Sequence, residues 1–374
     1  MPKILIKSPL PYWIPFQFFI SMLWLFSCHS VHAQTTATSL SLVKEKIPLT
    51  NSGTFYILDV IDKRSRKGNL LGDIYVYGQS RSLVSPQPLN RVLYEHWSYS
   101  MRNRLEDCLP LEIVLDEVSV EERKVAPNKI SGEIKVKVSF QWTRSAKPIF
   151  LTSYATASTY TRPETNYNHE PILRRMLDGA IRHFDQWIGL NEGKNPLLAR
   201  GVKLVFEQPD HNETSDTVFY KPARKLTWSD FQGSPNRPGQ RYAAAVFSSM
   251  SYEGNSKMAG KHLQVTIGMK VFMIKSMSWG KAEARKTYTL AHEQTHFDIT
   301  RIVAERFKEK LKKMDLTIED YDSQIQYEFL ESFREMNTEQ EKYDGESQHG
   351  LNTTVQAEWN QKIRAEIERI YRQS

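Results

Sequence analysis

Hydrophobic positions follow two different periods along the chain. Runs rich in β-branched and aromatic residues, with partial alternation, predict strands. In the first half these runs are TFYILDVID (54–62), GDIYVYG (72–78), LEIVLDEVSV (111–120), SGEIKVKVSFQW (131–142) and IFLTSYATASTYT (149–161). Two amphipathic stretches interrupt them, with apolar side chains at steps of about four from Leu89 to Leu105 and from Leu173 to Ile188, and these predict helices. The order β-β-α-β-β-β-α predicts an α+β domain.

The second half changes from strands to helices. Loop-like segments rich in Asn, Gly, Pro and Asp flank one short strand candidate, GVKLVFE (201–207), and two further strands are predicted at 243–254 and 262–274. Helical periodicity then predicts helices at roughly 281–313, 318–340 and 352–372. We therefore divide the chain into a leader (1–33), an α+β domain of unknown role (34–210) and a second α+β domain (211–374).

The first residues have the pattern of an export signal. Lys3 and Lys7 precede the apolar run YWIPFQFFISMLWLF, and SVHAQ offers a cleavage site after Ala33. The run is short for a membrane span and is interrupted by Pro15, so we predict an exported, periplasmic or extracellular protein without a stable membrane span after processing. A lipoprotein carried on Cys28 and a retained anchor are the alternatives.

Charge and cysteine content narrow the function classes. The formal net charge is +7 and the basic residues are scattered, which argues against a nucleic-acid partner. Cleavage after Ala33 would leave Cys108 as the one cysteine, so no intramolecular disulfide is expected. Such an exported chain has to be stabilised by its cores or by a metal.

The segment TLAHEQTHFDI (289–299) carries the strongest chemical signal. On a helix, His292 and His296 lie about 40° apart on the stripe that continues as the apolar face, and Glu293 lies about 100° from His292, on its flank. Two imidazoles one turn apart can bind one Zn²⁺, and the glutamate can act as general base without being a ligand. The alternative is two core histidines beside a surface glutamate.

A catalytic zinc site needs a third protein ligand. Asp298 and Glu305 lie on the far side of the helix, about 240° and 220° from His292, so the ligand has to come from downstream. Glu328 lies at the edge of the apolar face of the next predicted helix. The loop EKYDGESQHG offers Asp344, Glu346 and His349, although the same residues fit an ordinary turn between helices.

Four segments together resemble a known family. KLTWSDFQGSP, AAAVFSS, LAHEQTHFDI and YDGESQHGLNTTVQAEW resemble a bacterial family of secreted zinc-dependent proteases built on a domain of unknown function, over roughly residues 215–374. Two mild departures are Ser347, where threonine is expected, and Thr295, where glycine is expected. The resemblance implies a zincin-like fold, a Zn²⁺ cofactor and a peptide or protein substrate.

The resemblance also implies site residues. It favours His349 as third zinc ligand, with Glu328 or Asp344 as alternatives, and makes Tyr343 a candidate to stabilise the oxyanion, although a packed aromatic is an equally good interpretation. It further implies that the edge of the strand 262–274 pairs with an extended peptide. Trp228 and Phe231 form either a cleft wall or a turn that buries its aromatic rings.

Two other functions are compatible with the same sequence. The first is an envelope binding or assembly module, in which the first domain recognises a partner and the metal site is structural or degenerate. The second is metal-dependent hydrolysis of a non-peptide amide. The preferred hypothesis is a secreted zinc metallopeptidase with Glu293 as general base.

Overall fold

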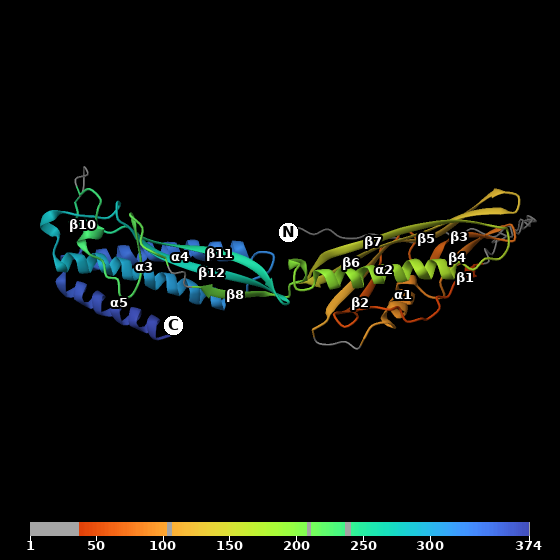
Figure 1. Cartoon of the computed structure of the whole chain (residues 1–374), viewed down its shortest axis with the longest axis horizontal. Coiled ribbons are helices and arrows are strands. Elements are labelled where there is room, and N and C mark those ends of the chain that lie inside the picture. Colours follow the sequence, from red (N-terminus) through yellow and green to blue (C-terminus); the bar gives the residue numbers. More distant parts are fainter. Residues whose placement is uncertain (1–36, 103–106, 208–210, 236–240, 374) are drawn as a thin grey trace, which may run out of the picture.

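The computed structural model describes residues 37–102, 107–207, 211–235 and 241–373. They form an elongated α+β molecule, in which a strand-rich lobe and a helix-rich lobe lie end to end (Figure 1). The predicted leader (1–33) and Leu105 fall outside the described residues. No helix among the described residues is long and apolar enough to cross a membrane.

The first lobe is built on a four-stranded sheet with the order β2-β5-β6-β7. β2 runs parallel to β5, and the other neighbours are antiparallel. Buried side chains alternate with half-buried or exposed ones through most of β6, so one face of this long strand packs on the core along nearly its whole length. The bounds of these strands are Phe55–Asp62 (β2), Leu109–Ala126 (β5), Lys129–Arg144 (β6) and Lys147–Arg162 (β7).

Two helices and a small sheet complete the first core. The small sheet has the order β1-β4-β3. Its strands β1 and β4 are short and polar, so they have no strand pattern in the sequence. The helix predicted from Leu173 to Ile188 is confirmed, and the one predicted from Leu89 is confirmed as far as Ser98, so that Met101 lies beyond its end. The apolar side chains of both helices join the same cluster of buried side chains. The bounds are Thr38–Ser39 (β1), Leu70–Val76 (β3), Gln79–Val84 (β4), Leu89–Ser98 (α1) and Glu170–Asn191 (α2).

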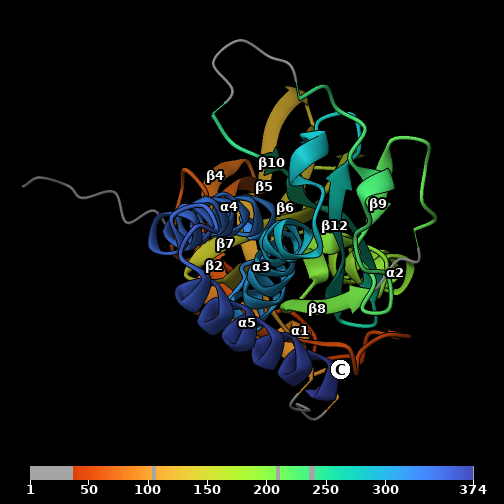
Figure 2. The ribbon, with the colours of Figure 1, turned by 90° about the vertical axis from the view of Figure 1, so that its left-hand side faces the viewer.

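The second lobe places a sheet and two helices around one long helix. α3 (Thr287–Lys313) lies between the strands and the helices α4 (Tyr321–Ser347) and α5 (Thr353–Gln373), as Figure 2 shows. The sheet has the order β11-β12-β8, and β9 also pairs with β12. A separate two-stranded ribbon joins β10 to β13. The strand bounds are Val202–Glu207 (β8), Thr217–Phe219 (β9), Ala244–Ala245 (β10), Ser248–Ala259 (β11), His262–Ile274 (β12) and Trp279–Gly280 (β13).

Two expectations about this lobe need correction. β8, which we assigned to the first domain, pairs with β12 from Val202 to Glu207, so the change of core falls before it: Leu198 belongs to the first core and Ala199 to the second. α4 does not end near residue 340, because it continues to Ser347. A parallel partner more than fifty residues away leaves no local trace in the sequence, and the Asp344-Gly345 turn signal is overridden by packing between helices.

Candidate metal centre

Two histidines of α3 face one carboxylate of α4. His292 and His296 are buried, with ring centroids 5.0 Å apart. Their Nε2 atoms lie 3.1 Å and 3.0 Å from Oδ1 of Asp344. One ligand atom from each of the three residues fits within 4.8 Å of the others. We call His292, His296 and Asp344 the metal triad.

Local backbone geometry brings Asp344 to this position. The residue lies in the last turn of α4, and the helix then ends at Gln348, whose left-handed backbone (φ 50°) directs its N–H toward the carbonyl oxygens of Asp344 and Gly345. Gly350 follows with φ 80°, and a Cβ there would lie 3.3 Å from Nδ1 of His292. Glycine therefore allows this turn to pack directly against the histidine.

Hydrogen bonding from α5 fixes one imidazole. Nδ1 of His292 lies 2.8 Å from Oε1 of Gln356, and the amide nitrogen of Gln356 donates to Tyr343 and Asn360. Since the amide oxygen is an acceptor, Nδ1 of His292 carries the proton and its Nε2 presents a lone pair. That lone pair faces a carboxylate oxygen, an arrangement that needs a proton or a metal cation between them.

The pKa values of the triad follow from this contact. Burial lowers the pKa of His292, but the hydrogen bond to Asp344 and the charge of Glu293 outweigh it and raise the pKa above its usual range. Burial raises the pKa of Asp344, but the two histidines hold it well below its usual range. Two imidazoles and a carboxylate are a donor set that Zn²⁺ takes in catalytic sites, so the residues present fit the metal.

Glu293 lies beside the triad and outside it. The side chain is almost fully buried and accepts the backbone N–H of Val246 at 2.8 Å. Burial raises the pKa of this carboxyl group above its usual range, against the lowering effect of His296 and His292. Glu293 and both histidines line a cavity of 520 Å³. Glu293 therefore shares the cavity with the metal triad but does not belong to the group of three converging ligand atoms.

The cavity has two walls that were not predicted from the sequence. One wall is the segment Arg241–Val246, which includes β10, and the other is formed by α4 and the turn after it. His349 and Tyr242 meet across the opening, with ring centroids 4.6 Å apart. The AAAVFSS pattern was the available signal for the first wall.

His349 and Glu328, two candidates for the third ligand, do not join the histidines. The side chain of His349 is 47% exposed, and its Nδ1 lies 3.4 Å from Oδ2 of Asp344. Glu328 pairs with Lys310 at 2.9 Å and precedes Asp344 by about four turns of the same helix, roughly 24 Å along its axis. Asp344, the remaining alternative, is the residue that lies against both histidines.

Tyr343 lies behind the histidines. It is fully buried, and its ring stacks on His292 with centroids 4.8 Å apart. Its hydroxyl accepts a hydrogen bond from Gln356. Burial raises the pKa of this phenol above its usual range. Tyr343 does not line the cavity. This placement does not fit the predicted oxyanion role, and it matches the packed-aromatic interpretation.

The structure also places the other predicted elements. Phe231 is buried against Trp228, with centroids 5.0 Å apart, and neither lines the cavity, in agreement with a turn that buries its aromatic rings. β12 is not an edge strand, because β11 pairs along its whole length on one side and β8 and β9 pair on the other. The predicted pairing of an extended peptide with the edge of β12 therefore does not fit this sheet.

The comparisons with known proteins do not place this chain in a family. No family model matches the sequence, and no curated protein matches it. A crystal structure of a Xanthomonas campestris protein described as DUF330 covers 41% of this chain and 92% of that chain, at 10% identity and a TM-score of 0.24. An uncharacterized protein covers 41% and 97%, at 9% identity and a TM-score of 0.20. Scores this low carry no argument about fold or activity, and neither description mentions zinc or a protease.

Proposed function

We propose that this protein is a zinc-dependent peptidase. The observation that carries the proposal is the convergence of Nε2 of His292, Nε2 of His296 and Oδ1 of Asp344, with Glu293 buried beside them in one cavity. We assign the metal triad as the zinc ligands, in place of the site completed by His349. Three protein ligands leave room for water or substrate in the tetrahedral preference of zinc.

Each group then has a distinct task. A zinc ion in such a site supplies Lewis acidity, which acidifies water and polarises a carbonyl group. Glu293 accepts a proton on its carboxylate from the attacking water and passes it to the leaving amine. Because Glu293 is buried, water solvates its carboxylate poorly, and the same burial raises its pKa toward neutral pH. Gln356 holds His292 with Nε2 directed at the site.

The side of β10 that faces the cavity is suited to an extended peptide. One side of this strand is used by β13, and the backbone N–H of Lys281 donates to the carbonyl oxygen of Ala243 on that side. The N–H of Val246 points the other way, to Glu293. Backbone groups two residues apart point to the same side of a strand, so those of Ala244 also face the cavity. A substrate backbone could therefore add to β10 as a strand.

The zinc content of matched variants tests the ligand assignment. We expect one zinc per chain in the parent and in His349→Ala, and loss of zinc in Asp344→Ala. Peptide cleavage should follow the same pattern and stop when a chelator is added. Zinc held by the Asp344→Ala variant but lost from His349→Ala would contradict the assignment. A stoichiometric zinc with no cleavage of any peptide would favour the structural role of an envelope assembly module.

A further inference from the structure

A second pocket lies on the opposite face of the metal helix. It has a volume of 370 Å³ and is lined by His211, by β9 and the segment after it, by α3 and β12, and by the end of α5. The two residues of α3 that line it, Arg301 and Lys308, fall about 180° and 160° from His292 around the helix axis. The pocket is therefore separate from the cavity that holds the metal triad, and a ligand in it would not touch the triad.

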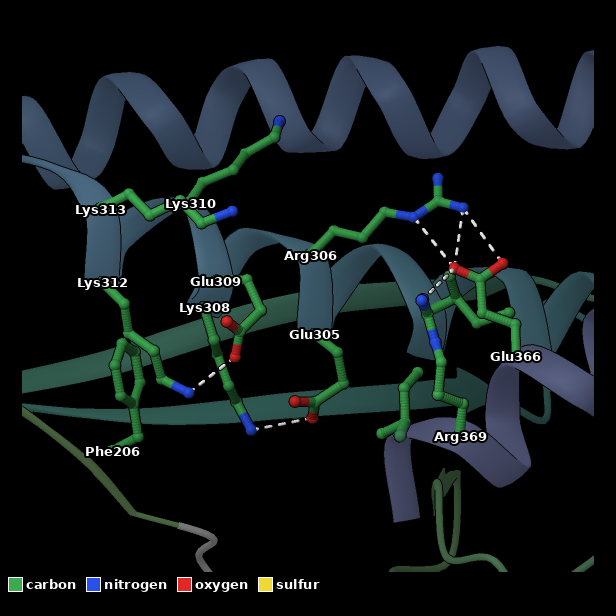
Figure 3. A pocket seen from close by; sticks show the side chains of 12 residues that line it. Phe206, Glu305, Arg306, Lys308, Glu309, Lys310, Lys312, Lys313, Glu366 and Arg369 are labelled. Carbon is green, nitrogen blue, oxygen red and sulfur yellow. Dashed lines mark hydrogen bonds and ion pairs between the residues drawn. The ribbon is translucent and has the colours of Figure 1, made fainter. Parts of the chain in front are cut away.

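Two buried cations share one carboxylate beside this pocket. Arg301 and Lys308 are 9% and 5% exposed. A guanidinium nitrogen of Arg301 lies 2.5 Å from Oε1 of Glu305, and Nζ of Lys308 lies 2.9 Å from the same oxygen. Figure 3, a view of a neighbouring pocket, shows the pair of Lys308 and Glu305 on α3. These three groups together carry one net positive charge, and a further carboxylate, Asp298, accepts a hydrogen bond at 2.7 Å from Tyr220 of the pocket wall. Buried charge of this kind is costly unless an opposite charge completes it.

Two buried nitrogen atoms at the pocket have no partner among the described residues. They are Nε of Arg301 and Nε2 of His211. Buried donors are almost always satisfied, and an unmet one costs free energy comparable to a lost hydrogen bond. Both residues line the same pocket, so a single bound group could satisfy both.

The remaining lining indicates the chemistry of that group. Lys221 and Lys270 add two basic side chains, of which Lys270 pairs with Glu253 at 2.6 Å, and neither Asp nor Glu appears among the described residues that line the pocket. The walls are aromatic: Phe219 packs against His211 with ring centroids 4.8 Å apart, and the guanidinium of Arg301 lies 5.6 Å from the ring centre of Tyr371. Arginine with lysine is the usual pairing for carboxylate and phosphate groups.

We propose that this pocket binds a compact oxyanion, a carboxylate or a phosphate group, through Arg301, Lys308 and His211. The bound group neutralises the net charge of Arg301, Glu305 and Lys308. It accepts hydrogen bonds from Nε of Arg301 and from the N–H groups of Lys308 that Glu305 does not use. The aromatic walls accommodate an attached planar apolar group. The site does not depend on the proposed peptidase activity.

Calorimetric titration of the full mature chain tests the site. The probes are inorganic phosphate and benzoate, and a chelator strips metal beforehand so that neither anion binds at the triad. We expect saturable binding of at least one probe at one site per chain. Preference for phosphate or for benzoate identifies which oxyanion the pocket takes. Saturable binding of neither overturns the proposal.

Charge variants separate this pocket from the general basic surface. Lys308→Met, which leaves Glu305 paired with Arg301, should weaken binding about tenfold or more, since a charge-assisted hydrogen bond is lost. Lys312→Met removes a charge from the same helix outside the pocket and should leave binding unchanged. If Lys308→Met does not fold, His211→Phe and Lys270→Gln replace it in the titration. We expect each of them to lower the affinity for the anion several-fold. Equal affinity in the parent and in the pocket variants overturns the proposal.

Discussion

Nδ1 of His292 on α3 lies 2.8 Å from Oε1 of Gln356 on α5, so the last helix of the chain orients a ring of the metal triad. Gln356 is itself almost completely buried. Partners of this kind fix the tautomer and the ring angle of a ligating histidine. The candidate site therefore depends on three helices.

Replacing this amide should weaken metal binding without unfolding the lobe. We expect Gln356→Leu to lower zinc affinity by about 10- to 100-fold, because His292 loses the acceptor that directs its Nε2 toward the site. Competition with a fluorescent chelator measures the affinity. Gln361→Leu, an exposed position on the same helix, is the matched control. Equal affinities for the two variants would show that Gln356 does not position the ring.

Gly350 should be needed for the turn that packs on His292. We expect Gly350→Ala to lower the free energy of unfolding by about 1–3 kcal/mol, since φ is 80° there and the added Cβ approaches Nδ1 of His292 to 3.3 Å. Zinc affinity should fall with it. Gly345→Ala is the control, because that glycine lies in α4 and a Cβ meets nothing within 4 Å. Urea unfolding of both variants measures the difference.

The hydroxyl of Tyr343 should be dispensable for hydrolysis. In Tyr343→Phe the ring keeps its stacking on His292, and the hydrogen bonds of the hydroxyl with Gln356 and Thr295 are lost. We expect zinc stoichiometry to be kept and kcat to change by less than about threefold. Loss of an oxyanion donor would instead lower kcat by about 10²–10³. A decrease of that size, with zinc retained, would show that the Tyr343 hydroxyl stabilises the oxyanion.

Acid should destabilise the first lobe through Glu122. Burial raises the pKa of this carboxyl group, but hydrogen bonds from His169, Arg162 and Tyr160 outweigh it and hold the pKa well below 4.5. The unfolded chain then binds the proton first, so the stabilisation is complete above about pH 4.5 and is lost as the pH falls toward the folded pKa.

A neutral variant checks this dependence. Glu122→Gln leaves Arg162 without its buried charged partner. We expect this change to lower the free energy of unfolding by about 3–5 kcal/mol at pH 7 and to make that free energy less dependent on pH in acid. Glu121→Gln, an exposed neighbour on the same strand, should behave like the parent. Circular dichroism of urea unfolding at several pH values gives both quantities. If the free energy of unfolding of Glu122→Gln falls in acid as steeply as that of the parent, other groups cause the loss of stability.

Local patterns predicted the parts of the site that lie on one element. The phase of α3 places His292 and His296 together and directs Asp298 and Glu305 away, and the structure has both features. The α+β class and the two helices of the first lobe follow from the same periodicity and are confirmed.

The third member of the triad depends on tertiary packing. Asp344-Gly345 has the sequence of a turn, but Tyr343 packs between the histidine rings and Trp359, and these contacts extend α4 past that point. Whether β12 or β10 offers a free edge depends on which distant strands pair with it. Neither feature has a local signal, so the sequence could not choose between His349, Glu328 and Asp344 or locate the substrate edge.

The most direct test of the peptidase proposal is the rate of peptide cleavage by zinc-loaded Glu293→Gln, compared with the zinc-loaded parent. This variant keeps the metal triad and removes the base. We predict one zinc per chain in both proteins and a kcat lower by about 10²–10⁴ in the variant. Cleavage at the parental rate, with zinc bound, would contradict it.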